Sequence, residues 1–591
     1  MSPSDGSRRP LIAAPARRLL LAGSVLLSAL TGIAVALGEA GTLAFLAWLA
    51  SLIASWALCR GAGPEHRLTA REWLALALLV ALAGFFRLYR IGEIPSGPWV
   101  DELAAAANAV NLAGRQPFTP FATTPLFEVG PQWVHTPNLY LYFCYVVLWL
   151  SGFSQFGMKL ISVLPGIAAP PLLYLLARRF LSRECALLGA GLLAVSDWQV
   201  TASRWGWDEV LVTALTVAAF AMLFSGVQDG RPSSFFLAGV LTGLAQFAYV
   251  AARLSAIAAL AFLALRAIEG GPRRRLAQLG VFSAGLLQTV LPMTVFWILH
   301  PATFAVRERE ISILPQLLAG NLRPLLENLR AYGLMLLVRG DANPRQNLPG
   351  LPMLDPVVGL LFVAGLLVAA ATWRQPESQL TLLWLSIGLV GGILSHPESA
   401  PNSYRVGIVA PACMLLAGMG WQAALALARK TRLTSLVRWS PYATAGLVAL
   451  SGALTFANYF VVRPASRECW LAVKEGAYCE VLRQRVERIM DARAQVFLDR
   501  RLNWMTTRLQ FDTLVARRRP PAAFRWVDEQ VVEPAALRHA VLFVEPKRYP
   551  ELPAALQALP ARGVANPFAE EIFVAISGDR KLLELVEPTT H

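Results

Sequence analysis

The sequence predicts a polytopic all-α membrane protein of about 13 transmembrane helices, with interfacial helices in its first outer loop and a small C-terminal α/β domain outside the bilayer. Three observations predict this fold class. The 591 residues are 55% hydrophobic and 15% charged, with a mean hydropathy of +0.49, a balance that no single water-soluble core accommodates. Apolar runs of about 20 residues, long enough to cross a bilayer, recur up to residue 461. Beyond that residue the density of charged side chains rises.

The predicted spans are these apolar runs. They cover residues 17–38, 42–60, 72–91, 158–178, 185–202, 209–226, 234–251, 254–268, 276–299, 354–373, 378–395, 404–426 and 440–461. The first run follows several arginines, as a secretory signal does. Because the second run begins almost at once, we interpret the first as an anchored span.

Short basic tracts between the spans set the predicted orientation. They are Arg60 to Arg71, Arg178/Arg179/Arg183, Arg273 to Arg275 and Arg429/Lys430/Arg432. Basic residues concentrate in cytoplasmic loops, and these tracts alternate correctly with the thirteen spans. The excess of 53 Lys and Arg over 38 Asp and Glu therefore indicates topology, and we expect no nucleic-acid partner.

An apolar, aromatic stretch from about Asn138 to Phe153 has two interpretations. As a fourteenth span it would place Arg178, Arg179 and Arg183 on the outer side. We assign it instead to an interfacial helix on the outer surface, because Tyr and Trp side chains suit the headgroup boundary. The fourteenth span remains the alternative.

Three long polar segments lie on the predicted outer side: residues 91–157, residues 300–353 and the tail. We expect a membrane domain over 1–461 and a soluble α/β domain over 462–591. The tail holds 20 Lys and Arg and 17 Asp and Glu. Its apolar runs Ala494 to Leu498, Ala540 to Glu545 and Glu571 to Ile576 predict buried strands, and Glu480 to Met490 has a helical pattern.

Six scattered cysteines include no CxxC pair, which makes a structural zinc site an unfavourable interpretation. Cys469 and Cys479 both lie in the tail. In an oxidising compartment they would form a disulfide, and two free thiols are the alternative.

Two acidic pairs are the strongest candidates for chemistry. Asp101 and Glu102 follow the third span, and Asp208 and Glu209 lie at the outer end of the fifth span, close to Arg204. Each pair would also suit a helix N-terminus. Because the basic tracts place both pairs on one face, we also predict a polar-substrate site in which carboxylates act as a general base or as metal ligands.

Other candidate substrate-binding residues lie near the same face. They are His135 in the first outer loop, Tyr249 and Arg253 between the seventh and eighth spans, Arg307 in the second outer loop, and Arg405 at the start of the twelfth span. Interfacial arginines often only reach toward lipid headgroups. Together they also offer the permanent charge and paired donors that a phosphate requires.

A series of motifs carries a family resemblance. They are Arg87-Leu-Tyr-Arg-Ile91 before Asp101-Glu102, His135-Thr-Pro137, Tyr174-Leu-Leu-Ala-Arg-Arg179, Ser196 through Arg204, Tyr249 to Arg253, Asn347 to Asp355, and Ser403-Tyr-Arg405. Over about the first 425 residues the chain resembles the GT-C superfamily of polyprenyl-phosphate-sugar glycosyltransferases. It is most similar to relatives of the protein O-mannosyltransferases (glycosyltransferase family 39) and of the lipid A aminoarabinose transferases.

The resemblance implies a GT-C-like fold and an acidic catalytic base in the first outer loop, which is Asp101 here, with Glu102 beside it. It implies an inverting displacement whose polyprenyl-phosphate leaving group is held by Arg405 and Arg253. Some members use a divalent metal such as Mg or Mn, which Asp101, Asp208 or Glu209 would hold. The family's His-Pro-Pro element is His135-Thr-Pro137 in this chain.

The expected partners are a polyprenyl-phosphate sugar donor, the bilayer, and a protein, lipid or glycan acceptor, in a bacterial inner membrane with an extracytoplasmic site. A transporter or flippase of lipid-linked saccharides is the main alternative, although such proteins usually have internal repeats and a midplane site. A non-catalytic assembly subunit is a third interpretation.

Overall fold

The computed structural model describes residues 23–28, 30–34, 41–60, 68–114, 117–129, 132–269, 272–304, 306–502, 505–518, 523–528 and 532–587. Most of the first predicted span, 17–38, lies outside these residues. The chain divides into two compact units. The first comprises Met1–Tyr89, Leu112–Phe143 and Ile161–Tyr459, and the second comprises Arg90–Asn111, Cys144–Leu160 and Phe460–His591. The predicted domain boundary after residue 461 remains a prediction.

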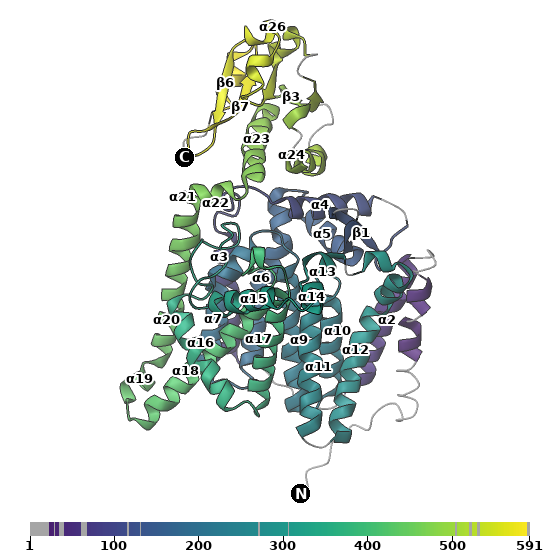
Figure 1. Ribbon diagram of the computed structural model, residues 1–591, viewed down its shortest axis with the longest axis vertical. Helices are drawn as coiled ribbons and strands as arrows, with labels where there is room; N and C mark the ends of the chain where they lie inside the picture. The colour runs from purple at the N-terminus through teal and green to yellow at the C-terminus, as the bar shows by residue number, and fades with distance from the viewer. Residues whose placement is uncertain are drawn as a thin grey trace. The chain divides into compact units, whose positions relative to one another are not determined.

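Apolar helices build the first unit at the positions of the predicted spans. They are α2 (Gly41–Cys59), α3 (Ala70–Leu88), most of α6 (Gln155–Ala177), α7 (Arg183–Val195), α8 (Asp197–Ser203), α9 (Glu209–Asp229), α10 (Pro232–Ala245), α11 (Ala252–Glu269), α12 (Pro272–Leu299), α16 (Pro356–Ala371), α17 (Pro376–Ile393), α18 (Ala410–Lys430) and α20 (Ser440–Phe456). Helices α9 and α12 both pack against α10 within this bundle (Figure 1). A helix satisfies its backbone hydrogen bonds internally, which is what a bilayer demands of an apolar segment.

Local sequence sets where two of these helices begin. Thr69 precedes α3, and its hydroxyl accepts a hydrogen bond from the amide of Glu72, whose carboxylate accepts one from the amide of Thr69. This reciprocal pair is a capping box. At α16 the carboxylate of Asp355 accepts from the amides of Val357 and Val358, so the motif Asn347 to Asp355 ends in an N-cap.

Fewer helices are long enough to cross a membrane than the predicted thirteen. Among the described residues six pass on length and composition, and eight pass if each bent pair counts as one span. The predicted span 185–202 is bent by 50° between α7 and α8, and α16 and α17 meet at 120°. At the first bend the hydroxyl of Ser196 accepts from the amide of Gln199 and so starts α8 as a new helix. The number of crossings remains a prediction.

The two long polar loops over residues 91–157 and 300–353 contain more structure than the sequence indicated. The first has α4 (Val100–Ala113), an antiparallel hairpin of β1 (Thr123–Val129) and β2 (Gln132–Pro137), and α5 (Asn138–Leu150). With 13 residues, α5 is about 20 Å long, less than the roughly 30 Å hydrocarbon core, which supports the interfacial assignment. The second has α13 (Val306–Ile311), α14 (Leu314–Leu318) and α15 (Arg323–Met335).

The tail in the second unit folds around a five-stranded sheet. Its strand order is β4 (Phe524–Val527), β3 (Gln495–Asp499), β5 (Ala540–Val544), β7 (Glu571–Ile576) and β6 (Ala561–Ala565), with β3 parallel to β4 and β5 and with β7 antiparallel to β5 and β6. The strands β3, β5 and β7 and the helix α23 (Lys474–Asp491) were predicted. The edge strands β4 and β6 were not, because they are short and only partly buried.

The predicted cysteine alternatives resolve as free thiols. Cys469 and Cys479 are both buried and unbonded to each other. The thiol of Cys479 donates to the side-chain oxygen of Gln510 at 2.7 Å.

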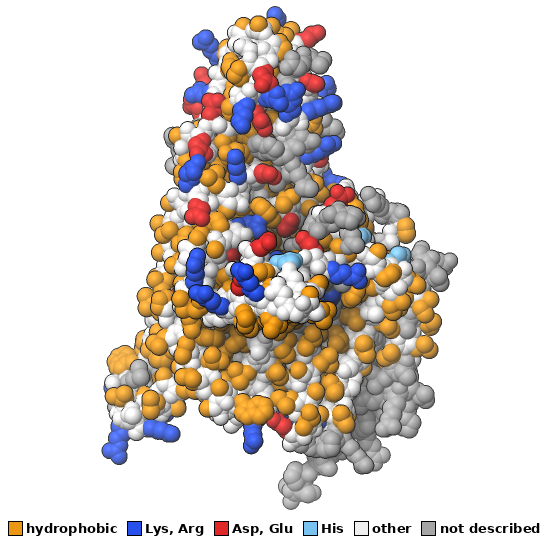
Figure 2. Space-filling model, in the orientation of Figure 1, with side chains coloured by type: hydrophobic (Ala, Val, Ile, Leu, Met, Phe, Trp, Pro, Cys, Tyr) orange, Lys and Arg blue, Asp and Glu red, His pale blue; other side chains and the backbone are white. Residues whose placement is uncertain are grey.

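Hydrophobic side chains cover most of the visible surface of the helical bundle, whereas charged side chains are frequent on the surface of the C-terminal tail (Figure 2). Leu43, Leu360 and Leu367 are among many large apolar residues that are more than three-fifths exposed. Apolar surface of this extent needs a bilayer or a partner to cover it. With several apolar helices of membrane length, it identifies a multi-pass membrane protein.

Candidate active site

Asp101 lies in the first turn of α4 and its side chain is exposed. The indole nitrogen Nε1 of Trp99, just before the helix, donates to Oδ2 of Asp101 at 3.1 Å. The positive end of the helix dipole also favours a carboxylate at this position. Asp101 is therefore an accessible carboxylate that a neighbouring side chain orients.

Glu102 takes the capping role that the sequence left open for this pair. Its Oε1 accepts from the backbone amide of Trp99 at 2.6 Å, and its two oxygens accept from Nζ of Lys159 at 2.8 and 3.0 Å. Both charged side chains are almost fully buried. Burial raises the pKa of Glu102 to about 7, although Lys159 acts in the opposite direction. Glu102, predicted as catalytic, therefore supports the start of α4.

Asp208 and Tyr404 lie at the centre of a second group of side chains, in the first unit. Asp208 is the N-cap residue of α9 but makes no side-chain capping hydrogen bond. Its Oδ1 instead accepts from the hydroxyl of Tyr404 at 2.6 Å. The ring centroid of Tyr404 is 4.8 Å from that of Trp207 and 4.9 Å from that of Tyr249. We call Trp207, Asp208, Tyr249 and Tyr404 the Tyr404 cluster.

A fixed loop presents Tyr404 and the following arginine. The buried carboxylate of Asp341 accepts from the amide and the hydroxyl of Ser403 at 2.7 and 2.9 Å. The hydroxyl of Tyr332 accepts from the amide of Asn402 at 3.1 Å. Because these partners hold the backbone at Asn402 and Ser403, the side chains that follow have a defined place.

Arg405, which follows Tyr404, is a candidate cation for an anionic ligand in the first unit. It is only partly exposed, and its Nη1 is buried without a hydrogen-bond partner among the described residues. An unsatisfied buried guanidinium group costs free energy, and a phosphate oxygen would satisfy it with a charge-assisted hydrogen bond.

Glu209 lies inside the bundle behind the Tyr404 cluster. Its side chain is fully buried, Oε1 accepts from the hydroxyl of Thr213 at 2.6 Å, and Oε2 has no partner among the described residues. Gly407 backs onto this carboxylate, since a Cβ there would lie 2.3 Å from Oε1. The structure thus gives Glu209 a buried setting, in contrast to the surface setting expected of a substrate ligand.

Arg204, predicted to bind substrate, instead hydrogen-bonds to the backbone at the end of α3. It is fully buried, and its guanidinium group donates to the carbonyl oxygens of Phe86, Arg87 and Tyr89 at 2.8 to 3.1 Å. Arg87 is buried beside it and donates to the carbonyl oxygen of Ala194 at 2.8 Å. These contacts give Arg204 a structural role, and backbone carbonyl oxygens accept hydrogen bonds from both buried arginines.

The remaining candidates occupy different surroundings. The guanidinium carbon of Arg253 lies 4.5 Å from the ring centroid of Phe304, a cation–π contact. His135 on β2 is within 3.1 Å of the hydroxyl of Thr123, and partial burial lowers its pKa. Arg307 belongs to α13, but its side chain lies outside the described part of the chain.

The described residues hold no group of three His, Cys, Asp or Glu side chains arranged to bind a metal. Asp208 and Glu209 do not combine as ligands, because Glu209 is buried and bonded to Thr213. The candidate carboxylates fit a metal only in part. We therefore derive no step through a metal.

Sequence reasoning missed four residues that organise these groups: Trp99, Lys159, Asp341 and Tyr404 as the partner of Asp208. Lys159 carried a signal, because it is a lone charged residue near the start of an apolar span, and such residues usually have a partner. The other three gave none, since their partners are distant in the chain or are side chains common at helix starts.

Residues 135–298 match the family model described as dolichyl-phosphate-mannose-protein mannosyltransferase. The match confirms, over these residues, the predicted resemblance to protein O-mannosyltransferases. No curated protein sequence matches the chain significantly.

Several solved structures of glycosyltransferases are similar to the chain. The archaeal oligosaccharyltransferase AglB from Archaeoglobus fulgidus, solved with an inhibitory peptide and a dolichol-phosphate, is 12% identical, with 86% of this chain and 74% of that chain covered and a TM-score of 0.46. ArnT from Cupriavidus metallidurans, bound to undecaprenyl phosphate, is 14% identical, with 88% and 100% covered and a TM-score of 0.44. The protein O-mannosyltransferase complex Pmt1-Pmt2 of S. cerevisiae, bound to the sugar donor, is 17% identical, with 42% and 35% covered and a TM-score of 0.30.

Proposed function

We propose that the chain is a membrane glycosyltransferase that moves a sugar from a polyprenyl-phosphate donor to a hydroxyl group of a protein, lipid or glycan. The family match over residues 135–298 and the multi-pass helical bundle support this class of enzyme. The observation that carries the chemistry is Asp101, an exposed carboxylate oriented by Trp99 at the start of a helix. Its neighbour Glu102 is already bonded to Lys159, which leaves Asp101 as the base.

In the proposed reaction, Asp101 accepts the proton of the acceptor hydroxyl while the oxygen of that hydroxyl attacks the anomeric carbon. The new glycosidic C–O bond forms while the bond from the anomeric carbon to the phosphate oxygen breaks. The electron pair of that bond leaves with the polyprenyl phosphate, and the anomeric centre inverts. The charge of the leaving group needs a cation, and the unsatisfied Nη1 of Arg405 is the supporting observation for that role.

The Tyr404 cluster supports a sugar-binding role in the same proposal. Aromatic faces pack against the apolar C–H faces of a sugar ring, while carboxylate and phenol oxygens bond to its hydroxyl groups. Trp207, Tyr249 and Tyr404 supply the faces, and Asp208 supplies the carboxylate. We infer from the basic tracts that these residues work on the extracytoplasmic side, and from the family resemblance that the membrane is a bacterial inner membrane.

The test is sugar transfer by the purified protein in lipid, with a panel of radiolabelled polyprenyl-phosphate sugars and several acceptors. We expect Asp101→Asn to lower transfer about 10²- to 10⁴-fold, the usual contribution of a general base, while donor binding persists. The matched control is Glu93→Gln, which removes an exposed carboxylate of the same loop that pairs only with the neighbouring Arg90 and should leave transfer unchanged.

Unchanged transfer by Asp101→Asn would remove Asp101 from the mechanism and direct attention to Asp208. Donor binding by the wild-type protein without transfer to any acceptor would contradict the enzyme and favour a flippase. A parallel assay with chelator, followed by added Mg²⁺ or Mn²⁺, determines whether the reaction needs a metal.

A further inference from the structure

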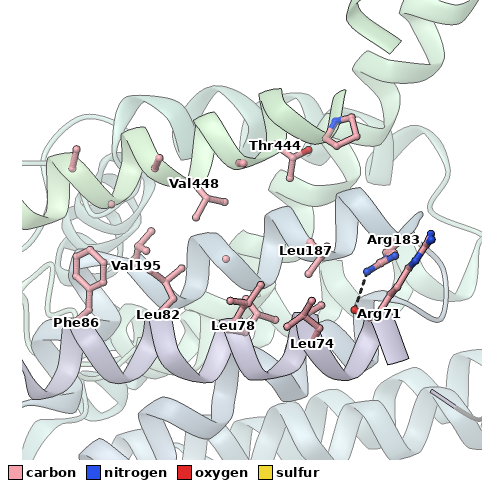
Figure 3. Close-up of a pocket in the computed structure, with 18 of the residues that line it drawn as sticks. Arg71, Leu74, Leu78, Leu82, Phe86, Arg183, Leu187, Val195, Thr444 and Val448 are labelled. Atoms are coloured by element: carbon pink, nitrogen blue, oxygen red, sulfur yellow. Dashed lines mark hydrogen bonds between the residues drawn. The ribbon is translucent and has the colours of Figure 1, made fainter. Parts of the chain in front are cut away.

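A long cleft of about 720 Å³ lies in the first unit between α3, α7 and α20. Its walls are almost entirely apolar, with Leu74 and Leu78 from α3 facing Val448 from α20 (Figure 3). Leu74 and Leu78 are each about three-fifths exposed. An apolar cleft with this much exposed surface needs lipid or a partner to cover it.

One end of the cleft is basic. Figure 3 shows Arg71 and Arg183 together at that end, with Phe86 and Val195 at the other. The guanidinium group of Arg183 donates to the carbonyl oxygen of Arg71 at 2.9 Å through Nη2, while its Nε is buried without a partner among the described residues. Two guanidinium groups at the mouth of an apolar cleft are complementary to an anionic headgroup with an apolar chain.

The nearby carboxylates Glu72 and Glu184 bond to partners other than Arg71 and Arg183. Glu72 accepts from Arg178 at 3.2 Å and from Thr69. Glu184 accepts from the hydroxyl of Ser440 at 2.7 Å.

Exposed aromatic residues mark the same end as the level of the lipid headgroups. Trp73 follows Arg71 on α3, and Trp439 and Tyr442 lie at the start of α20, all more than half exposed. Tryptophan and tyrosine with this exposure are typical of a membrane–water interface. The positively charged end of the cleft is therefore where a headgroup phosphate would lie.

The cleft also has the length of a lipid chain. From Arg71 to Phe86 along α3 the rise of an α-helix gives about 22 Å, more than the roughly 15 Å half-thickness of the hydrocarbon core. One acyl chain of the adjacent leaflet therefore fits without leaving the cleft.

We propose that this cleft binds one anionic phospholipid, with an acyl chain between α3 and α20 and the headgroup phosphate at Arg71 and Arg183. The site is separate from the Tyr404 cluster, because α7 and α8 run from Arg183 at the basic end to the turn that holds Asp208. Basic pockets between helices are a common way to select anionic lipids. The proposal does not depend on the proposed glycosyl transfer.

The test is native mass spectrometry of the full-length protein after exchange with phosphatidylglycerol or phosphatidylcholine. The wild-type protein should retain one phosphatidylglycerol in preference to phosphatidylcholine. Arg71→Gln with Arg183→Gln should lower that preference about 25-fold, since each arginine near an anionic lipid contributes about fivefold. Arg438→Gln, an exposed arginine near the same end that does not line the cleft, is the matched control.

A second variant tests the chain-binding part without changing charge. Ala449 lines the cleft and is exposed, so Ala449→Trp should fill the space and abolish retention of phosphatidylglycerol. Leu450→Trp, on the neighbouring exposed position outside the cleft, should leave it unchanged, and equal melting temperatures would show that both variants fold. Equal retention of the two lipids by wild type, or one-for-one displacement of phosphatidylglycerol by a polyprenyl phosphate, would overturn the proposal.

Discussion

The two Asp-Glu pairs of this protein have the same sequence and both lie at the start of a helix, but their surroundings differ. In both, the glutamate is buried and the aspartate is the more accessible residue. Glu102 is bonded to the buried cation Lys159, whereas among the described residues Glu209 has only the neutral hydroxyl of Thr213 as a partner. Asp101 is held by an indole, and Asp208 by a phenol that belongs to a distant loop.

The comparison shows that the partner, and not the dipeptide, decides what each carboxylate does. The Lys159–Glu102 ion pair keeps a charged group in the interior next to Asp101, so it stabilises the geometry around the proposed base. In the pair Asp208-Glu209, Asp208 accepts a hydrogen bond from Tyr404. This bond connects the start of α9 to the loop that carries Arg405. Four expected outcomes test this difference.

Replacing Lys159 with Met should have the largest effect on stability. It leaves Glu102 buried without its cation, which typically costs about 3–5 kcal/mol when the carboxylate is ionised. The free energy of unfolding in detergent at pH 8.5 measures it. Glu102→Leu combined with Lys159→Met should restore most of the loss, whereas Lys474→Met, at an exposed lysine, should change nothing. A loss below about 1 kcal/mol would contradict a buried ion pair.

The stability should depend on pH through Glu102. Burial raises its pKa in the folded protein to about 7 from an ordinary value of 4.5, so the folded state binds this proton more tightly than the unfolded state. The contribution is complete below about pH 4.5 and is lost as the pH rises through 7. Melting temperatures from pH 4.5 to 8 should therefore fall more steeply for wild type than for Glu102→Gln. Parallel curves would show that Glu102 does not titrate in this range.

Tyr404→Phe should have a moderate effect that appears in function. It removes the hydroxyl that donates to Asp208 but keeps the ring against Trp207. A lost hydrogen bond to a charged group should raise the KM for the sugar donor about tenfold, with a melting temperature close to wild type. Tyr442→Phe, at an exposed tyrosine, is the control. An unchanged KM would separate the Tyr404 cluster from donor binding.

Glu209→Gln should have the smallest effect. The amide oxygen of the introduced glutamine can still accept the hydrogen bond from Thr213. The substitution removes no ion pair, because Glu209 has no cationic partner among the described residues. We expect a change in the free energy of unfolding within about 1 kcal/mol, measured as for Lys159→Met. A loss as large as that of Lys159→Met would mean that the two pairs are electrostatically alike.

Much of the fold follows from local sequence. Uninterrupted apolar runs predict the helices, since a bilayer leaves an apolar segment few other structures. The buried strands β3, β5 and β7 are continuous apolar runs and were predicted within a residue or two. The bend at Ser196 and the edge strands β4 and β6 were not predicted, because a single polar residue or a short mixed strand has no distinctive pattern.

The candidate site was predicted less completely. Asp101 and Asp208 were identified as candidates, but the sequence did not separate them from Glu102 and Glu209. Arg204 was predicted to bind substrate because it lies beside an acidic pair, while the structure turns its guanidinium group toward three backbone carbonyls. Sequence position alone does not show the direction of a side chain at a helix end.

By itself the sequence determined that this is a multi-pass membrane protein with long polar segments between and after its apolar helices. Hydrophobicity and basic residues can be read from short stretches of sequence, without knowledge of distant contacts. The sequence also determined the resemblance that residues 135–298 confirm. Only the tertiary structure decided which carboxylate is paired, which is oriented and which is buried. Those properties depend on partners such as Lys159 and Tyr404, which are 57 and 196 residues away from the groups they bind, and such contacts arise only when the helices pack.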